Sequence, residues 1–457
     1  MFKNMNKPVD MTKGKPWKGI IEFTLPMLIG NIAQQLYATV DSIVVGRYIG
    51  DNALASVGSS TPILTMILAL FIGVSGGAGI MVSQYFGAKS REDLSYSVGN
   101  SIIATLFCCL FLMIFATPFI YPLLKMFNTP DSIIGECTNY LTISVLGIAG
   151  LGFYNILSGI IRAFGDSVSA LIYLLVATVI NIVLDIYFVA KLNMGVGGVA
   201  LATVIAQFVS ALLCMWKLSK MTDFFDMKKK YFKPSKKYIM TIIRLGLPSG
   251  LTQAIMSSAM IVVQSLTNCF GELFIAANVV IMRVDGFAMM PNFSFGMSLT
   301  TYSGQNVGAG LYDRVTKGAK QGTLIAVLCS TVITGIILLF GKSLMGVFTE
   351  TQELVDMSYR LMMILAVGYI AVAVSQSLSG IMRGAGDTMT PMWISLITTV
   401  FLRVPIAYGI SFLTRTEQLP YGMKECIQIS LLSSWVIGAF LTVVFYLKGN
   451  WKKKRLK

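Results

Sequence analysis

The segment SGIIRAFGD at residues 158–166 returns as SGIMRGAGD at residues 379–387. The spacing of 221 positions is shared by Gln84 and Gln305, each of which begins a Gln-x-x-Gly-Ala motif. A spacing that holds for motifs so far apart in the chain indicates an internal duplication, in which one half repeats the structure of the other.

The duplicated halves are strongly apolar. Of the 457 residues, 55% are hydrophobic and only 12% are charged, and the mean hydropathy is +0.73. Soluble domains carry about twice this charged fraction. Apolar runs of about 20 residues, each long enough to cross a bilayer, lie at about 18–46, 53–86, 94–120, 132–160, 167–190 and 197–219 in the first half, and at 238–269, 274–307, 316–340, 353–381, 388–412 and 427–447 in the second. The sequence therefore predicts an all-α membrane protein of about twelve transmembrane helices.

A repeat of six helices returns the chain to the same side of the membrane, because six is an even number. The two repeats are then parallel and form two lobes with a central cleft. We expect the longest polar stretch, at residues 217–237, to be the hinge between the lobes. The predicted organisation is a cytoplasmic N-terminal segment 1–16, an N-lobe 17–219, an inter-lobe linker 220–237, a C-lobe 238–447 and a basic cytoplasmic tail 448–457.

Basic residues predict the orientation. If both termini lie on one side, that side receives 27 Lys and Arg residues and the opposite side receives seven. By the positive-inside rule both termini are cytoplasmic, in a bacterial-type cell (inner) membrane. The net charge of +15 belongs to residues that flank the spans, which indicates contact with membrane lipids and argues against nucleic acid as a partner.

The carboxylates of Asp41 and Asp185 lie in strongly apolar stretches of the first half. Asp41 lies inside the apolar stretch 20–45, and Asp185 follows Asn181 by one helical turn, on the same helix face. Ionisable groups at such depth are costly and indicate function by default, although a structural hydrogen-bond cluster is the alternative. The chain has no histidine, so proton coupling would require carboxylates.

The duplicated half does not share these acids. Asp41 corresponds to Val262 or Val263, Asn181 to Leu402 and Asp185 to Ile406. The duplication therefore kept the scaffold and placed the polar site in one lobe.

Three features together resemble the multidrug and toxic compound extrusion (MATE) family over nearly the whole chain. They are the segment PMLIGNIAQQLYATVDSIVVGRYIG at residues 26–50, the paired Gln-x-x-Gly-Ala turns and the duplicated Arg-x-x-Gly-Asp motifs. The resemblance favours the DinF-like branch and implies a cation or proton site made of Asp41, Asn181, Asp185 and Thr203. It also implies that the first helix bends at Pro26 as this site is loaded; a static kink is the alternative, because Pro248 occupies the equivalent place in the half without the acids. A second-lobe ion site is not expected, because the helices that carry it in the other bacterial branch offer only Gln253, Gln264 and Gln376.

Other polar residues inside predicted helices are candidates for substrate binding: Gln34, Tyr37, Asn155, Arg283 and Asp285. Interhelical hydrogen bonding is the alternative role for such groups. Arg403 is a further charge within a span, and Arg162 and Arg383 are expected to form ion pairs with Asp166 and Asp387 that fix short cytoplasmic turns.

These observations predict a monomeric secondary antiporter that exports lipophilic or cationic compounds in exchange for H⁺ or Na⁺. The oxygen ligands of the site suit either ion. No enzyme activity and no cofactor are expected, and no phosphate-binding loop for ATP is found. The alternative is a flippase for lipid-linked precursors, which would need a basic cavity; only Arg283 and Arg403 could supply it.

Overall fold

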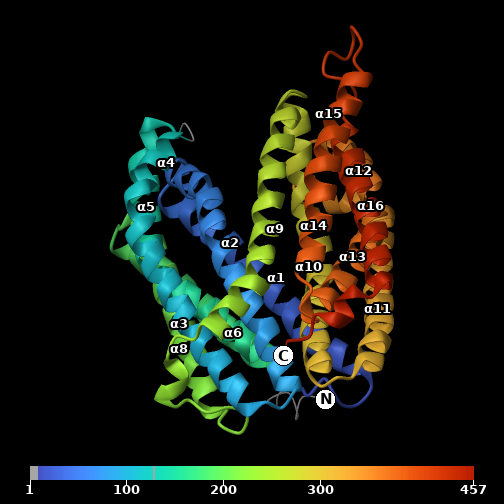
Figure 1. Ribbon diagram of the computed structural model, residues 1–457. Helices are drawn as coiled ribbons and strands as arrows, with labels where there is room; N and C mark the ends of the chain where they lie inside the picture. Colours follow the sequence, from blue (N-terminus) through green and yellow to red (C-terminus); the bar gives the residue numbers. More distant parts are fainter. Residues whose placement is uncertain (1–8, 127–128, 457) are drawn as a thin grey trace. The chain divides into compact units, whose positions relative to one another are not determined.

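The computed structural model describes residues 9–126 and 129–456, and this part of the chain is helical without strands (Figure 1). Parts of the predicted N-terminal segment and tail, residues 1–8 and 457, lie outside the described residues. The all-α prediction is confirmed.

The elements of the first repeat are α1 (Pro16–Tyr48), α2 (Asp51–Gly87), α3 (Arg91–Phe115), η2 (Thr117–Phe119), α4 (Ile120–Met126), α5 (Asp131–Leu146), α6 (Ile148–Ala163), α7 (Ser167–Ile186), the π-helical η3 (Tyr187–Lys191) and α8 (Gly195–Lys220). The short η4 (Lys229–Phe232) lies in the linker. The second repeat consists of α9 (Lys236–Asn268), α10 (Glu272–Gly308), α11 (Tyr312–Gly346), α12 (Gln352–Ala366), α13 (Gly368–Gly384), α14 (Met389–Leu396), the π-helical η5 (Ile397–Arg403), α15 (Val404–Leu413), α16 (Cys426–Lys448) and η6 (Asn450–Lys453).

The repeat is visible in the helix bounds. Helices α1 and α9 both have 33 residues, and α2 and α10 both have 37. Gly50 and Gly271, which precede α2 and α10, both have positive φ, a conformation that glycine adopts without steric cost. The same local signals therefore begin the same helix in each half.

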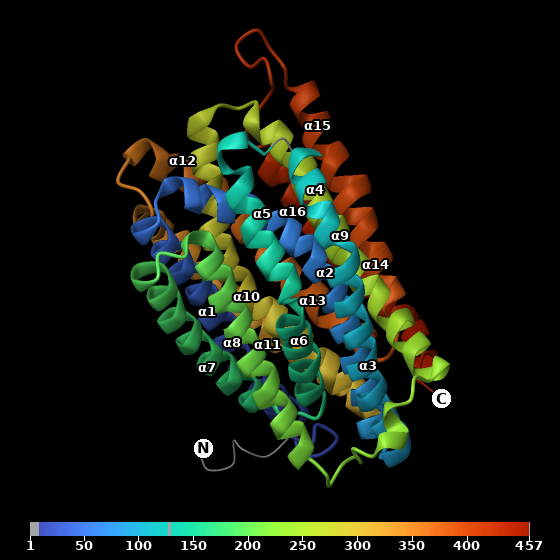
Figure 2. The same ribbon diagram turned by 90° about the vertical axis from the view of Figure 1, so that its left-hand side faces the viewer.

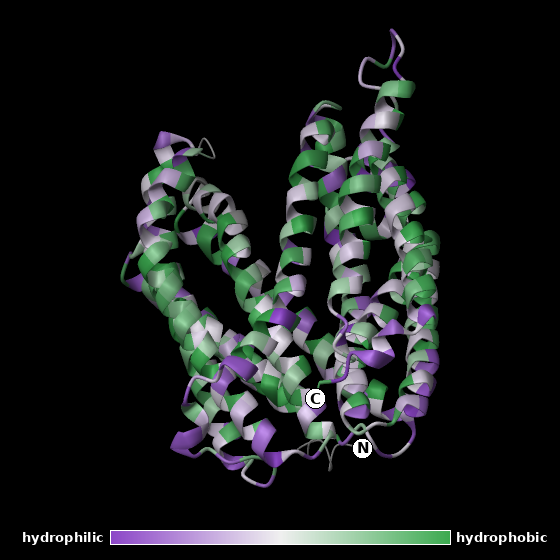
Figure 3. Ribbon diagram, in the orientation of Figure 1, coloured by the Kyte–Doolittle hydropathy of each residue, from purple (hydrophilic) through white to green (hydrophobic). Residues whose placement is uncertain are grey.

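Nine helices in the described part of the chain are long and apolar enough to span a membrane, or up to eleven if each of two bent pairs counts as one span. The pairs are α5 with α6, bent by 49°, and α12 with α13, bent by 44°. Helix α1, which corresponds to the first of the twelve predicted spans, is not among these spans. Figure 3 shows the apolar colouring along the helices and the polar colouring gathered at helix ends and loops. The chain is a multi-pass membrane protein.

Tertiary contacts divide the chain into two compact units whose borders lie inside helices. Unit 1 comprises Leu25–Gly250 with the residues up to Asp10, and unit 2 comprises Met11–Thr24 and Leu251–Lys457. The first residues of α1 thus belong to unit 2, and the first part of α9 belongs to unit 1. The chain passes from one unit to the other close to Pro26 and Pro248, which both lie within helices.

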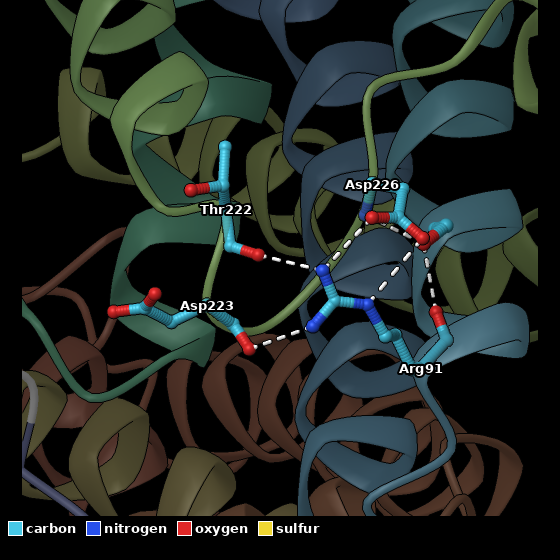
Figure 4. Close-up of polar contacts among 5 residues, drawn as sticks. Arg91, Thr222, Asp223 and Asp226 are labelled. Carbon is cyan, nitrogen blue, oxygen red and sulfur yellow. Dashed lines mark hydrogen bonds and ion pairs between the residues drawn. The ribbon is translucent and has the colours of Figure 1, made fainter.

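The linker is bound to unit 1 through the side chain of Arg91 (Figure 4). Its guanidinium donates to the carbonyl oxygens of Thr222 at 2.7 Å and Asp223 at 2.9 Å, and forms an ion pair with Asp226 at 2.8 Å. This contact holds the pKa of the Asp226 carboxyl below its usual value. The interaction of ionised Asp226 with Arg91 therefore stabilises the folded protein at pH values above the ordinary pKa of an aspartate. This stabilisation is lost as the pH falls through the lowered pKa of Asp226.

Helix α3 holds the rest of the linker as well. Asn100 accepts a hydrogen bond from the Ser235 backbone N–H at 2.7 Å, and the Tyr96 ring makes an edge-on contact with Tyr231. Tyr231 and Tyr238 are buried, while the six linker lysines between residues 228 and 237 are exposed. Residues 221–235 are thus a docked part of unit 1.

The segment before α1 is held in unit 2 by a comparable arginine. Arg314, in the first turn of α11, donates to the carbonyl oxygens of Met11, Lys13 and Gly14. The Met11 N–H donates to Gln305 at 3.0 Å, and the Met11 side chain is buried. In both repeats, the segment before the first helix therefore has carbonyl groups bound by an arginine. Arg314 binds the segment before α1, and Arg91 binds the linker before α9.

We expect Arg91→Ala to release the linker, because the Arg91 side chain binds the carbonyl oxygens of both Thr222 and Asp223. Limited trypsin digestion of the purified protein should then cut severalfold faster at Lys228–Lys230. Lys89→Ala is the control, since Lys89 makes none of these contacts. Equal cleavage of wild type and Arg91→Ala would show that the linker is held without Arg91.

The predicted ion pair between Arg162 and Asp166 is wrong. Asp166 binds Lys217 at 3.0 Å and accepts from the Ser169 backbone N–H at 2.9 Å, which caps α7. Gly165, with φ +91°, turns the chain so that the Asp166 carboxylate faces the start of α7. Asp387 similarly accepts from Thr390, so the predicted role in starting helices is confirmed.

Candidate functional site

Three helices of unit 1 bring five polar residues together. Tyr37 and Asp41 lie on α1, Asn181 and Asp185 on α7, and Thr203 on α8. Figure 2 shows α7 beside α8. The side chains of Asn181 and Asp185 are fully buried. Asp185 is the second-last residue of α7, and the π-helical η3 begins two residues later, at Tyr187. Such π-helical turns occur often at functional sites.

Thr203, on α8, connects this helix to both α1 and α7 through its hydroxyl group. Its hydroxyl lies 3.2 Å from the Tyr37 hydroxyl and 3.2 Å from the Asn181 amide. With the amide oriented to satisfy both neighbours, the Asn181 nitrogen donates to Asp185 Oδ2 at 2.8 Å and its oxygen accepts from the Thr203 N–H. The residues therefore form one connected hydrogen-bond network.

The carboxyl groups of Asp41 and Asp185 lie within hydrogen-bonding reach of each other. One oxygen of each, Oδ1, is buried and has no hydrogen-bond donor among the described residues. Two carboxylates in contact repel each other unless they share a proton or bind a cation. The arrangement can hold one exchangeable positive charge.

Among the residues that the structure describes, the other electrostatic neighbours of this pair are the hydroxyls of Tyr37 and Tyr140. None of these neighbours is a cation. Tyr140, on α5, was not predicted from the sequence. It belongs to a regular buried stripe with Cys137 and Leu141, so nothing in its spacing distinguishes it from a core residue.

Two of the predicted substrate-binding residues of unit 1 lie apart from this network. Gln34 is exposed on α1. The Asn155 side chain donates to the Leu151 carbonyl one turn earlier in α6, at 2.9 Å. Tyr37, also predicted to bind substrate, is instead part of the network around Thr203.

In unit 2, Asp285 and Arg283 on α10 have different surroundings. Asp285 accepts a hydrogen bond from the Tyr369 hydroxyl at 2.9 Å, whereas Arg283 is exposed. Gln264 lies on α9, one of the two helices that carry an ion site in the other bacterial branch. It is exposed and donates a hydrogen bond to Asn268. The predicted residues of unit 2 therefore do not form one site.

Pro26 is buried within α1, two residues after the border between the units. It removes one backbone hydrogen bond from the helix, which makes this position easier to bend than its neighbours.

The MatE family model matches two segments, residues 26–187 and 248–409, which correspond to the two repeats. The probable multidrug resistance protein YoeA of Bacillus subtilis is 28% identical and covers 98% of this chain and 97% of its own length. The probable multidrug resistance protein NorM of Thermotoga maritima is 25% identical and covers 96% and 93%. The crystal structure of MATE in complex with MaL6 has a TM-score of 0.90 at 24% identity, covering 98% of this chain and 100% of its own. A MOP superfamily transporter from Pyrococcus furiosus, described as having a binding pocket of reverse polarity, has a TM-score of 0.88 at 24% identity. Because the family model matches both repeats and the solved structures share the fold along almost the full length, this chain belongs to the MatE family of membrane transporters.

Proposed function

We propose that this protein exports lipophilic, cationic compounds in exchange for H⁺ or Na⁺. The observation that carries the proposal is the proximity of the Asp41 and Asp185 carboxyl groups, which have no cationic neighbour among the residues that the structure describes. A proton shared by the carboxyls, or a sodium ion bound by their oxygens, offsets the charge that this site would otherwise bury. The names of the relatives, which include multidrug resistance and multidrug export proteins, support the choice of substrate.

The ion site comprises Asp41, Asn181, Asp185 and Thr203, and Tyr37 connects it to α1. Asp285 and Gln34 are retained as substrate contacts, because a carboxylate attracts a cationic compound and Gln34 is accessible. The protein works as a monomer in a bacterial inner membrane, with both termini in the cytoplasm.

Ion and substrate compete in this scheme. Loading of the acid pair changes the charge next to Tyr37 on α1, and α1 can bend near Pro26. Each tenfold change in substrate affinity on loading corresponds to about 1.4 kcal/mol of coupling.

Efflux from proteoliposomes tests the proposal directly. We expect ethidium transport to be driven by either an imposed Na⁺ gradient or an imposed H⁺ gradient, applied separately, because a site with one exchangeable charge couples to the ion that fills it. Ethidium fluorescence reports the rate. Protein-free liposomes are the control.

Transport that responds to neither gradient would contradict antiport. Translocation of a fluorescent phospholipid in the same vesicles without any gradient would instead indicate the lipid flippase.

A further inference from the structure

Helix α9 carries an exposed apolar stripe in the part that belongs to unit 1. Met240, Ile243 and Leu247 are spaced by three and four residues, so they share one face of the helix, and they are 53%, 46% and 54% exposed. The opposite face packs on α2 through Gly246 and Gly250. Because α9 is apolar and long enough to span a membrane, its exposed face contacts lipid acyl chains.

Two cations accompany this stripe. Lys236 is the first residue of α9 and lies one helical turn before Met240, and Arg244 lies one turn after Met240. Both side chains are exposed. The linker lysines Lys230 and Lys237 are paired with carboxylates of α3, whereas neither Lys236 nor Arg244 has an ion pair within residues 9–126 and 129–456. The stripe therefore has uncompensated positive charge at its polar end.

Arg244 can bring its charge toward Lys236. Eight residues separate the two positions, which places their Cα atoms about 12 Å apart along the helix axis. Side chains of a helix lean toward its N-terminus, and arginine keeps its methylene groups in apolar surroundings while its guanidinium reaches the polar boundary. Both charges are thus available at the level where the apolar stripe ends.

The first helix of the other repeat lacks this arrangement. The prolines within α1 and α9 are 222 residues apart, and at this spacing Arg244 corresponds to Glu22 and Lys236 to Gly14. Glu22 forms an ion pair with Lys18 at 3.9 Å. The repeat therefore balances its charges at this place in α1 and leaves two cations without a counter-charge in α9.

The docked linker adds positive charge beside the start of α9. Lys233 is exposed and has no ion pair in the part of the chain that the structure describes. The hydrogen bond from the Ser235 N–H to Asn100 at 2.7 Å holds this segment against α3. Its charge is therefore fixed near Lys236, and clusters of Lys and Arg next to a membrane span attract anionic lipid headgroups.

We propose that the face of α9 formed by Lys236, Met240, Ile243, Arg244 and Leu247 binds an anionic phospholipid. Lys236 and Arg244 hold the phosphate, and an acyl chain lies along the three apolar side chains. A lipid such as phosphatidylglycerol fits best, because a zwitterionic lipid carries its own ammonium group next to the phosphate. This inference is independent of the proposed antiport, since it concerns lipid binding and requires no transport.

Tryptophan fluorescence of the protein reconstituted in vesicles tests this site. Leu247→Trp places a reporter on the stripe, and Leu25→Trp is the matched control at the equivalent and similarly exposed position of α1. Brominated phosphatidylglycerol and brominated phosphatidylcholine are compared as quenchers at equal mole fraction, after subtraction of the wild-type signal. At Leu247→Trp we expect phosphatidylglycerol to bind at least about fivefold more strongly, the factor contributed by one basic residue near an anionic headgroup.

At Leu25→Trp the two lipids should quench equally. Equal quenching at Leu247→Trp overturns the proposal, and so does an equal preference for phosphatidylglycerol at both positions. Ile243→Trp is a second reporter on the same stripe, for use if Leu247→Trp does not fold, and should show the same preference as expected for Leu247→Trp.

Charge variants assign the preference to the two cations. Lys236→Glu/Arg244→Glu, made in the reporter protein, should abolish the preference for phosphatidylglycerol. Lys228→Glu/Lys229→Glu is the control with the same change in net charge, because both lysines are exposed on the linker and not on α9. Its preference should remain, and its loss would show a general effect of charge and overturn the site on α9.

Soluble glycerol phosphate distinguishes a lipid from a free phosphate compound. In excess, it should leave the quenching by brominated phosphatidylglycerol unchanged, because it has no acyl chain to occupy the stripe. Relief of quenching would identify a soluble phosphate compound as the ligand and overturn the lipid site. A failure of efflux in the vesicle assay would refute the proposed antiport and leave these quenching results unaffected.

Discussion

Asp185→Asn is expected to reduce ion-driven efflux by about a hundredfold, equivalent to about 2.7 kcal/mol of lost coupling. The amide keeps the shape of the side chain and can still bond to Asn181, but it can neither hold a proton nor offer a charged ligand to Na⁺. Asp41→Asn should act in the same direction, because each carboxyl group neighbours the other. Initial efflux rates in proteoliposomes under the driving gradient measure the effect.

Asp131→Asn is the control for this substitution. Asp131 is an exposed acid in the first turn of α5 and takes no part in the network. We expect the Asp131→Asn variant to transport ethidium at the wild-type rate. Normal coupling in both Asp41→Asn and Asp185→Asn would remove the ion site from unit 1.

The second large effect concerns packing within unit 1. Gly73 and Gly77 on α2 face Gly246 and Gly250 on α9, and each pair has the Gly-x-x-x-Gly spacing that lets helix backbones approach closely. A Cβ on Gly246 would overlap the Gly73 carbonyl oxygen, and one on Gly77 would lie 2.8 Å from the Gly246 nitrogen. The neighbouring atoms are backbone, so they cannot move aside as a side chain can.

Gly246→Leu should therefore destabilise the protein by about 3 kcal/mol or more. The expected result is a large loss of monodisperse protein in size-exclusion chromatography and a lower unfolding midpoint. Gly58→Leu on α2 is the matched control, because Gly58 is exposed and has open space around it. Equal behaviour of the two variants would mean that the close approach is not needed for stability.

Much of the fold follows from the sequence. The duplicated motifs and the apolar runs predict paired sets of helices, and the glycines before α2 and α10 recur because both turns need positive φ. The bends between α5 and α6 and between α12 and α13 were not predicted, since each half of a bent pair continues the same apolar run. Gly147 and Gly368, which stand at these bends, pack directly against Val204 and Trp435 of other helices.

The candidate site was predictable where charge marked it. Asp41 and Asp185 stand out because carboxylates are rare in spans, and the structure brings them together with Asn181 and Thr203. Tyr140 and Tyr369 could not be found in the same way, because tyrosines at helical spacing look like core residues until their hydroxyls have a partner. The borders between the units lie inside α1 and α9, where hydropathy does not change and only tertiary contacts can reveal them.

The placement of these borders bears on how such a chain could arise by duplication. The opening residues of α1 belong to unit 2 and the opening part of α9 belongs to unit 1, so neither repeat completes a unit from its own residues alone. In an ancestor that encoded one repeat, the same connectivity would require two copies to exchange their first helical segments, which is a domain-swapped homodimer. Gene fusion would then have joined two subunits that were already interdependent.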